Sequence, residues 1–248
     1  MKRLLASMAA LALLAPSALA QVKTSDITIK SGDEEIKAFL AVPEGKGPFP
    51  AVVVIQEWWG LNDWIQDNAK HFAAKGFVAI APDLYRGKVT DDPKIAAQLR
   101  KGMPSDRALQ DCKAAVTAVA VMPNVQKNKI GSIGWCMGGG WSIKLAEDQP
   151  KLAAFVVNYG SLPTDKALIA KINAPMLGNF GAEDKGIPPE SVQAFEDAMK
   201  AAGKSTDIKI YGGAGHAFEN PNNRDGYRPE ATADAEKRVA TFFRKNLH

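Results

Sequence analysis

The sequence predicts an α/β fold in which a mainly parallel central sheet is flanked by helices. Apolar segments rich in β-branched residues alternate with helical patterns, which is typical of strand–helix–strand crossover units. A glycine-rich turn at residues 134–140 follows one of these apolar segments, as expected where a parallel strand passes into a helix. The 248 residues contain no internal repeat, low-complexity tract or linker that would divide the chain. We therefore expect one domain.

The first twenty residues have the composition of a cleavable secretory signal. Lys2 and Arg3 form a basic start, an apolar stretch runs over residues 4–16, and Ala18-Leu19-Ala20 follows. The apolar stretch is too short for a membrane-spanning helix, and no other run in the sequence approaches the required length. We expect residues 1–20 to be removed and residues 21–248 to form a single exported domain, in the periplasm and without a membrane span.

The charge balance argues against a nucleic-acid partner. The chain has 31 basic and 27 acidic residues, a formal net charge of +4 at pH 7. Removal of Lys2 and Arg3 with the signal leaves 29 basic residues and a net charge of about +2. A charge this small is too weak for the basic surface that nucleic-acid binding requires.

The strands and helices are expected in a defined order. Residues 25–30 and 36–42 are expected to form an antiparallel hairpin at one edge of the sheet. Buried strands are expected at 51–56, 77–81, 129–134, 153–158, 175–181 and 208–211, and helices at 63–75, 105–121, 137–147, 190–202 and 229–246. Ser105 is the expected N-cap of the second helix. The segments 85–104 and 219–228 are expected as loops that wall a pocket, because both follow carboxyl ends of strands.

A cysteine stands in the glycine-rich turn, in the pattern Gly134-Trp135-Cys136-Met137-Gly138. Such a turn holds its central residue in a strained conformation, and the glycines leave room for the neighbouring chain. The backbone N–H of Met137 would lie at a helix N-terminus, which favours a thiolate and a developing oxyanion. The alternative is a Gly-rich turn with an inert buried cysteine. Cys112 is expected to be such a buried thiol, because it lies on the apolar stripe of the helix at 105–121.

A candidate acid follows the second expected strand after the cysteine turn, at 175–181. Asp184 lies in Gly181-Ala182-Glu183-Asp184, directly after the apolar segment 175–181. Glu183 is the alternative acid, and either carboxylate could instead simply begin the following helix. The order of nucleophile followed by acid is the one expected for a hydrolase whose nucleophile lies in a strand-to-helix turn.

The candidate base is found by elimination, because the chain has three histidines. His71 lies on an amphipathic helical pattern, and His248 is the last residue of the chain. His216 follows the last expected strand in the loop Gly212-Gly213-Ala214-Gly215. A histidine downstream of the nucleophile and the acid completes the triad order.

No cofactor motif accompanies these residues. The sequence has neither a Gly-x4-Gly-Lys-Ser/Thr phosphate loop nor a His-Glu-x-x-His zinc motif. The spacing of Gly131, Gly134 and Gly138 does not fit a dinucleotide fingerprint. We expect no metal and no organic cofactor.

These motifs together resemble the dienelactone hydrolase (carboxymethylenebutenolidase) family, a cysteine branch of the α/β-hydrolase fold. The resemblance spans nearly all of residues 21–248. It is carried by Gly-Trp-Cys-Met-Gly-Gly at 134–139, Gln-Glu-Trp-Trp-Gly at 56–60, Ala-Pro-Asp-Leu-Tyr-Arg-Gly at 81–87, Gly-x-x-Asp at 181–184 and Gly-His-x-Phe at 215–218.

The resemblance implies a role for each residue of the triad. Cys136 would be the nucleophile, His216 the base and later the acid, and Asp184 the residue that orients His216. The backbone N–H groups of Met137 and Trp58 would form the oxyanion hole. The expected enzyme is a cysteine hydrolase that cleaves an ester or lactone through an acyl-enzyme on Cys136.

Glu57 resembles the family's glutamate that contacts the resting thiol and shifts when substrate arrives. A carboxylate beside a thiol disfavours the thiolate, so Glu57 would keep the thiol protonated until substrate displaces it. The alternative for Glu57 is an ion pair with a nearby arginine such as Arg86.

Family substrates carry a carboxylate that arginines bind. Arg86 is the candidate for one such contact, with Tyr85 beside it, and Trp59 and Trp58 add aromatic surface to the pocket. The family's second arginine position, four residues after the histidine, holds Asn220 here. Arg224 and Arg228 follow a few residues later as substitutes. The expected partner is a small-molecule ester or lactone, anionic if these contacts form, and the protein is expected to be a monomer.

Two other functions are compatible with the sequence. An amide hydrolase or peptidase of the same fold would use the same triad, but such enzymes often add a large gating domain. A noncatalytic thiol sensor or binding protein would keep the fold, but it would not need Cys136, Asp184 and His216 together.

Overall fold

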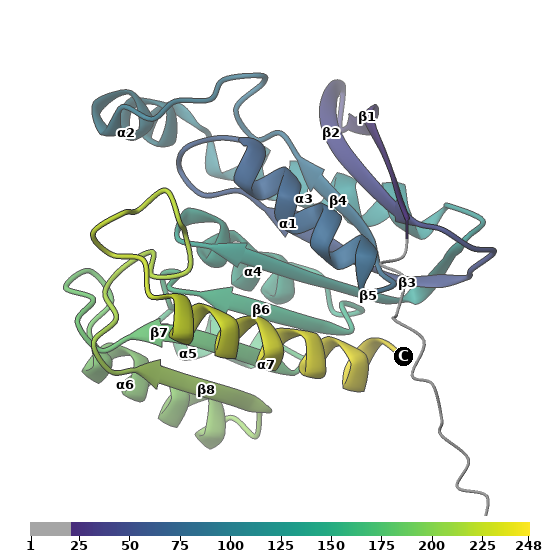
Figure 1. The fold of residues 1–248 in the computed structure, drawn as a ribbon. Helices are drawn as coiled ribbons and strands as arrows, with labels where there is room; N and C mark the ends of the chain where they lie inside the picture. Colours follow the sequence, from purple (N-terminus) through teal and green to yellow (C-terminus); the bar gives the residue numbers. More distant parts are fainter. Residues whose placement is uncertain (1–20) are drawn as a thin grey trace, which may run out of the picture.

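The computed structural model describes residues 21–248, and the expected secretory signal at residues 1–20 lies outside the described residues. Within them the chain forms an eight-stranded sheet in the order β1-β2-β4-β3-β5-β6-β7-β8 (Figure 1). The strands are β1 (Val22–Ser31), β2 (Glu34–Pro43), β3 (Phe49–Ile55), β4 (Val78–Pro82), β5 (Val125–Trp135), β6 (Ala154–Asn158), β7 (Met176–Gly181) and β8 (Thr206–Tyr211). The helices are α1 (Asp63–Ala74), α2 (Pro93–Gly102), α3 (Ser105–Ala120), α4 (Met137–Asp148), α5 (Lys166–Lys171), α6 (Pro189–Ala201) and α7 (Pro229–Leu247).

The sheet is mainly parallel, as predicted. β1 and β2 form the expected antiparallel hairpin at one edge, and β2 pairs antiparallel with β4. The other neighbouring strands all pair in parallel. The chain runs from β3 outward to β4 and then returns across β3 to β5, so the strand order reverses between β3 and β5. Ligand sites of open α/β sheets lie at the carboxyl ends of the strands at such a reversal.

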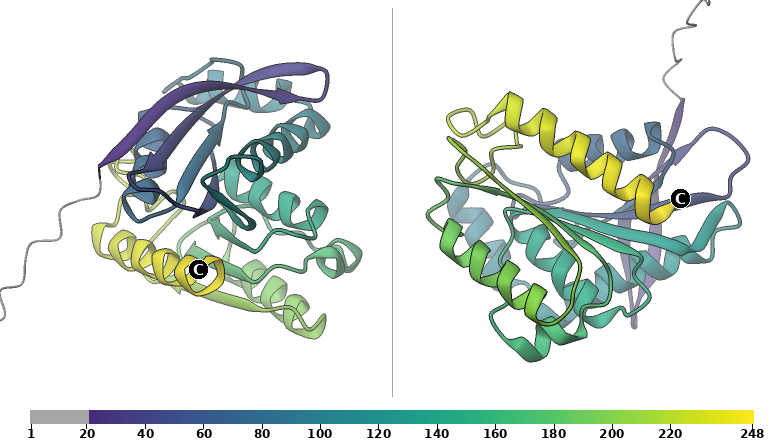
Figure 2. Two further views of the ribbon diagram at one scale, coloured as in Figure 1. Left: turned by 90° about the vertical axis from the view of Figure 1, so that its right-hand side faces the viewer. Right: turned by 90° about the horizontal axis from the view of Figure 1, so that it is seen from below.

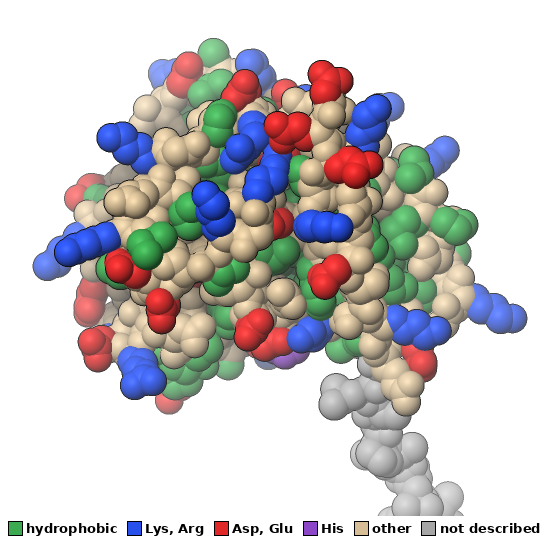
Figure 3. Space-filling view, turned by 90° about the horizontal axis from the view of Figure 1, so that it is seen from above, with side chains coloured by type: hydrophobic (Ala, Val, Ile, Leu, Met, Phe, Trp, Pro, Cys, Tyr) green, Lys and Arg blue, Asp and Glu red, His purple; other side chains and the backbone are tan. Residues whose placement is uncertain are grey.

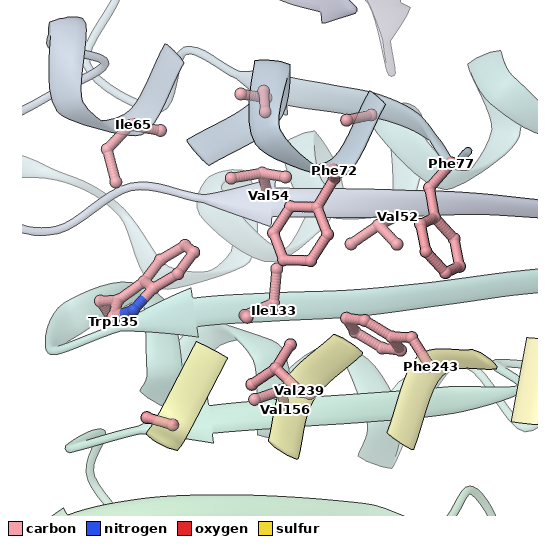
Figure 4. Close-up of a cluster of buried hydrophobic side chains, with 14 of the residues drawn as sticks. Val52, Val54, Ile65, Phe72, Phe77, Ile133, Trp135, Val156, Val239 and Phe243 are labelled. Carbon is pink, nitrogen blue, oxygen red and sulfur yellow. The ribbon is translucent and has the colours of Figure 1, made fainter. Parts of the chain in front are cut away.

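Helices cover both faces of the sheet (Figure 2). α1 and α7 pack on one face, and Figure 4 shows Phe72 of α1 and Phe243 of α7 against the alternating apolar side chains of β3, β5 and β6. α3 and α4 cover the opposite face, and α5 and α6 extend this layer toward β7. Burial of a side chain such as Phe243, which is fully enclosed, contributes about 2–3 kcal/mol to stability. The two cores hold the sheet rigid, so the residues at its carboxyl edge have fixed positions.

Two short helices lie where the sequence analysis expected irregular chain. α2 occupies part of the segment 85–104, and α5 follows β6. Each begins with a capping aspartate, because the side chain of Asp92 accepts a hydrogen bond from the N–H of Lys94 and that of Asp165 accepts one from Ala167. The expected N-cap of α3 was wrong. Pro104 occupies that position and Ser105 is the first helical residue, because the rigid proline already has the extended conformation of a cap.

The surface carries charges of both signs, and both thiols are free (Figure 3). No helix within residues 21–248 is long and apolar enough to cross a membrane. Acidic and basic side chains are interspersed on the face shown in Figure 3. Neither cysteine forms a disulfide, and Cys112 is fully buried on α3, where burial raises the pKa of its thiol. Cys136 is the more exposed of the two.

Candidate active site

Cys136 lies in a strained turn between β5 and α4. Its φ of 53° and ψ of −115° place it in a region that L-residues rarely adopt. The glycines around it are sterically required. A Cβ on Gly134 would overlap the carbonyl of Gly138, and a Cβ on Gly138 would overlap the carbonyl oxygens of Ile55 and Gln56 at the end of β3. The close packing of the turn therefore stabilises the strained conformation and presents the thiol at the carboxyl edge of the sheet.

Asp184 and His216 form a hydrogen-bonded pair beside this turn. Asp184 Oδ2 lies 2.7 Å from His216 Nδ1, and Asp184 Oδ1 accepts hydrogen bonds from the N–H groups of Gly186 and Ile187 at 2.9 and 3.1 Å. Burial alone would raise the pKa of Asp184, but His216 and the two N–H groups lower it below its usual value. The structure thus brings Asp184, rather than Glu183, to His216. Neither of the other histidines is placed this way, since His71 is exposed on α1 and the His248 ring packs on Phe77.

His216 is close enough to Cys136 for the two side chains to influence each other's charge. Burial by itself would lower the pKa of His216, but the hydrogen bonds that the imidazole makes to the Asp184 carboxylate and the Cys136 sulfur raise it to about 10. The Tyr159 ring packs edge-on against the imidazole, with ring centroids 5.3 Å apart. A pKa of about 10 makes the histidine a cation over the neutral pH range.

Glu57 reaches the same site from the neighbouring strand. Ile55 of β3 pairs with Gly134 of β5. Glu57 and Cys136 each lie two residues after a member of this pair, at the same edge of the sheet. The Glu57 side chain is 1% exposed, and Asn220 Nδ2 donates a 2.7 Å hydrogen bond to its Oε2. Burial raises the pKa of Glu57 to about 7, although Asn220 and His216 oppose the shift. At neutral pH its carboxyl is therefore close to half-protonated.

Arg86, the expected carboxylate contact, does not line the cavity that contains Cys136. Its guanidinium lies 2.7 Å from Asp111, a fully buried residue of α3, and 2.8 Å from Glu34 in β2. Asp83 fixes the turn that aims Arg86 there, because its carboxylate accepts hydrogen bonds from the N–H groups of Tyr85 and Gly87. Arg86 is therefore held by Asp111 and Glu34, and the alternative pairing of Arg86 with Glu57 does not form.

Tyr85 is placed behind the site rather than in it. It is 4% exposed, and its hydroxyl donates a 3.2 Å hydrogen bond to the sulfur of Met137. Burial raises the pKa of this phenol to about 12. Tyr85 therefore supports the first residue of α4 and does not line the cavity that contains Cys136.

A cavity of about 650 Å³ opens over Cys136, His216 and Glu57. Trp58 and Trp59 form part of its wall, with ring centroids 4.8 Å apart. Both expected walls contribute, since Thr90, Asp91 and Arg100 come from the segment 85–104 and Asn220, Asn222 and Asn223 from 219–228. Figure 1 shows α2 and the segment between β8 and α7 at the same end of the sheet.

Arg100 of α2 is the arginine that lines this cavity, and the sequence analysis missed it. The signal that could have found it is the Asp92-Pro93 pair, because a capping aspartate before a proline is a common helix start. Arg228, one of the expected substitutes, instead donates to the backbone carbonyl oxygens of Gly213 and Asp225.

The family model described as "Dienelactone hydrolase family" matches residues 36–247. This chain belongs to the dienelactone hydrolase family. It is 32% identical over 234 residues to the "Putative carboxymethylenebutenolidase" of Methylorubrum extorquens. The matched region covers 89% of this chain and 80% of the relative. The resemblance found in the sequence motifs is thereby confirmed.

Solved structures of dienelactone hydrolase-like proteins superpose closely on the chain. A dienelactone hydrolase-like promiscuous phosphotriesterase from metagenomic libraries is 26% identical, with a TM-score of 0.84 over 92% of this chain and 99% of that one. The acylaminoacyl peptidase of Pyrococcus horikoshii shares the fold alone, at 17% identity and a TM-score of 0.73 over 92% of this chain and 42% of that one. The α/β-hydrolase fold is confirmed.

Within residues 21–248, no three His, Cys, Asp or Glu side chains are grouped so that they could hold a metal ion.

Proposed function

We propose that the protein is an exported cysteine hydrolase that cleaves an ester or lactone through Cys136, His216 and Asp184. The observation that carries the proposal is the 2.7 Å Asp184–His216 hydrogen bond beside the strained turn of Cys136, in a cavity large enough for a small molecule. Family membership supports the ester or lactone as the bond that is cleaved. The composition of residues 1–20 supports export to the periplasm.

The proposed reaction gives each of these groups a role. The Cys136 thiolate attacks the carbonyl carbon, and the oxyanion that forms accepts hydrogen bonds from the N–H groups of Met137 and Trp58. The carbon–oxygen bond then breaks, and His216 donates its proton to the departing alkoxide. His216 next takes a proton from water, which attacks the thioester and releases the acid and the thiolate. Asp184 holds the imidazole in the required orientation through Nδ1.

The direct test is hydrolysis of two substrates of different charge. Purified residues 21–248 are expected to cleave neutral p-nitrophenyl acetate and an anionic dienelactone, and to cleave a matched p-nitroanilide far more slowly. Turnover of the anilide at a rate similar to that of the esters would instead favour the peptidase. Failure to cleave either ester, with Cys136 still alkylated by iodoacetamide at neutral pH, would contradict the proposed bond specificity.

Glu57→Gln is expected to speed alkylation of Cys136 above pH 7 and to leave it unchanged at pH 5.5. The pKa of Glu57 is raised to about 7, so the carboxyl is neutral below that pH and negative above it. A negative charge beside the thiol disfavours the thiolate, and glutamine removes this opposition only where Glu57 is ionised. The measurement is the rate of iodoacetamide modification against pH. Equal rates for the variant and the unsubstituted protein at pH 8 would contradict this role of Glu57.

Arg100→Gln is expected to raise KM for the anionic lactone about five- to tenfold and to leave KM for p-nitrophenyl acetate unchanged, because an exposed charged hydrogen bond contributes about 1 kcal/mol. Arg86→Gln is the matched control. It should not change the ratio of the two KM values, but it should lower stability by about 3 kcal/mol because it leaves buried Asp111 without its cation. Steady-state kinetics and thermal unfolding check both variants. A selective KM effect at Arg86 instead of Arg100 would contradict the assignment.

A further inference from the structure

The third glycine after Cys136 is not explained by the strained turn. The two glycines before it have no room for a Cβ, since one packs against the end of β3 and a Cβ on Gly139 would lie 2.8 Å from the Cα of Gly160. A Cβ on Gly140 would instead lie 3.8 Å from the Cβ of Ser161, which is an ordinary van der Waals contact. Glycine inside a helix is less favourable than alanine. Packing within the described part of the chain therefore does not require this glycine, and its presence lowers the stability of α4.

Gly140 borders a cavity of about 370 Å³ along the first turns of α4, which we call the α4 cavity. This volume is in the range of small-molecule sites. Most of the wall is apolar and comes from Met137 and Trp141 of α4, Met103 before α3, and Leu162, Pro163 and Leu168 around the start of α5. Two charged side chains, Lys144 and Glu147, line the cavity farther along α4. The Lys144 ammonium lies 4.4 Å from the centroid of the Trp141 ring. The α4 cavity thus suits an apolar group between charged surroundings.

The α4 cavity adjoins the catalytic cavity, because Arg100 of α2 lines both. The two also meet along the chain, since Cys136 lines the catalytic cavity and the next residue, Met137, lines the α4 cavity. In the proposed reaction the N–H of Met137 binds the oxyanion. The carbonyl group of the substrate would therefore lie where the two cavities meet.

The position of His216 indicates which part of the substrate faces the α4 cavity. His216 and Ala217 line the catalytic cavity and not the α4 cavity, and the same holds for Asn220. In the proposed reaction His216 donates its proton to the departing alkoxide, so the alcohol part of the ester faces these residues. The acyl part is attached to the other side of the carbonyl carbon. It extends away from His216 and past Met137.

We propose that the α4 cavity is the subsite for an apolar acyl chain, and that the missing side chain at Gly140 keeps it open. The inference rests on the proposed function, because it assigns the acyl part of the ester that Cys136 attacks. The helix rises about 10 Å from Met137 to Lys144, so the apolar wall matches a chain of about six to eight carbons. Each methylene that leaves water in this subsite stabilises the bound ester.

The test compares p-nitrophenyl hexanoate with p-nitrophenyl acetate, which have the same leaving group and differ by four methylenes. The ratio of their kcat/KM values should be about ten or more in the unsubstituted protein, since each methylene that is fully buried is worth about threefold. Gly140→Leu fills the α4 cavity and should lower this ratio to about one. Gly140→Ala should lower it by a smaller factor and should raise the unfolding temperature by about 2 °C, because alanine favours the helix.

Gly102→Leu and Gly102→Ala are the matched controls. Gly102 is the last residue of α2 and lines neither cavity, and a Cβ there would meet nothing within 4 Å among the described residues. Both variants should keep the ratio of the unsubstituted protein. If Gly140→Leu does not fold, Ser161→Leu replaces it, because Ser161 is exposed and borders the same space from the opposite wall. The ratio should fall there too.

Ethyl acetate and hexyl acetate test the assignment to the acyl part, because these esters differ by four methylenes in the alcohol. Acid release should show that Gly140→Leu leaves their kcat/KM ratio in place. A fall in this ratio instead of the hexanoate ratio would overturn the assignment. An acyl ratio near one in the unsubstituted protein, an acyl ratio that none of the variants lowers, or a lower unfolding temperature in Gly140→Ala would also overturn the inference.

The two proposals fail in different ways. If ester turnover does not require Cys136, the proposed function fails, whatever the chain-length ratios show. If turnover requires Cys136 and acetate and hexanoate are cleaved with equal efficiency, only the role of the α4 cavity fails.

Discussion

Replacement of Cys136 by alanine is expected to abolish ester turnover and to leave the fold intact. The acyl-enzyme cannot form without the sulfur, so kcat/KM for p-nitrophenyl acetate should fall about 10⁴-fold or more. Alanine, like cysteine, has a single Cβ and meets the same strain at φ 53°, and the site is only partly buried. The free energy of unfolding should therefore change by about 1 kcal/mol or less. Turnover assays and thermal unfolding of the same preparation measure both quantities.

The second cysteine supplies the control. Cys112→Ala removes a fully buried thiol from α3, so it should lower the unfolding temperature while kcat/KM is preserved. The two variants thus separate loss of chemistry from loss of stability. Turnover that survives in Cys136→Ala would contradict the assignment of the nucleophile, and so would a loss of turnover confined to Cys112→Ala.

The turn around Cys136 could be predicted because its information is local. Gly134 and Gly138 are required by contacts within a few residues of the cysteine and with the end of β3, so the glycine spacing itself indicates the strained backbone. The positions of Asp184 and His216 follow from the parallel sheet, since the carboxyl ends of β5, β7 and β8 share one edge. Alternating apolar patterns therefore predicted the sheet, and the sheet predicted which side chains meet.

Contacts between distant segments could not be predicted in this way. Arg86 matched a family motif, but its partner Asp111 lies 25 residues later on α3, and no local pattern indicates that the two side chains meet. The bond from Trp135 to Glu219 joins residues 84 positions apart. Arg100 depends on α2, a helix that is only ten residues long and that the glycine- and proline-containing sequence around it obscured. Side-chain partners of this kind are determined by packing and not by sequence spacing.

His216→Ala is expected to lower kcat/KM by about 10³- to 10⁴-fold, and to lower the alkylation rate of Cys136 at pH 7 by a smaller factor. In the proposed mechanism both reactions need the thiolate, which the imidazolium stabilises. The pKa of His216 is raised to about 10, so this cation is present at lower pH and is lost as the pH rises through that value. In the proposed mechanism turnover also needs His216 to donate a proton to the leaving group and to activate water, whereas alkylation by iodoacetamide needs neither step.

The comparison of the two rates is what tests the role of His216. If the histidine served only to ionise Cys136, turnover and alkylation would fall by the same factor in His216→Ala, and that result would contradict its role as base and acid. His71→Ala is the matched control, because His71 is exposed on α1 and its loss should change neither rate. A larger fall in turnover than in alkylation requires a histidine that both pairs with the sulfur and transfers protons during the reaction.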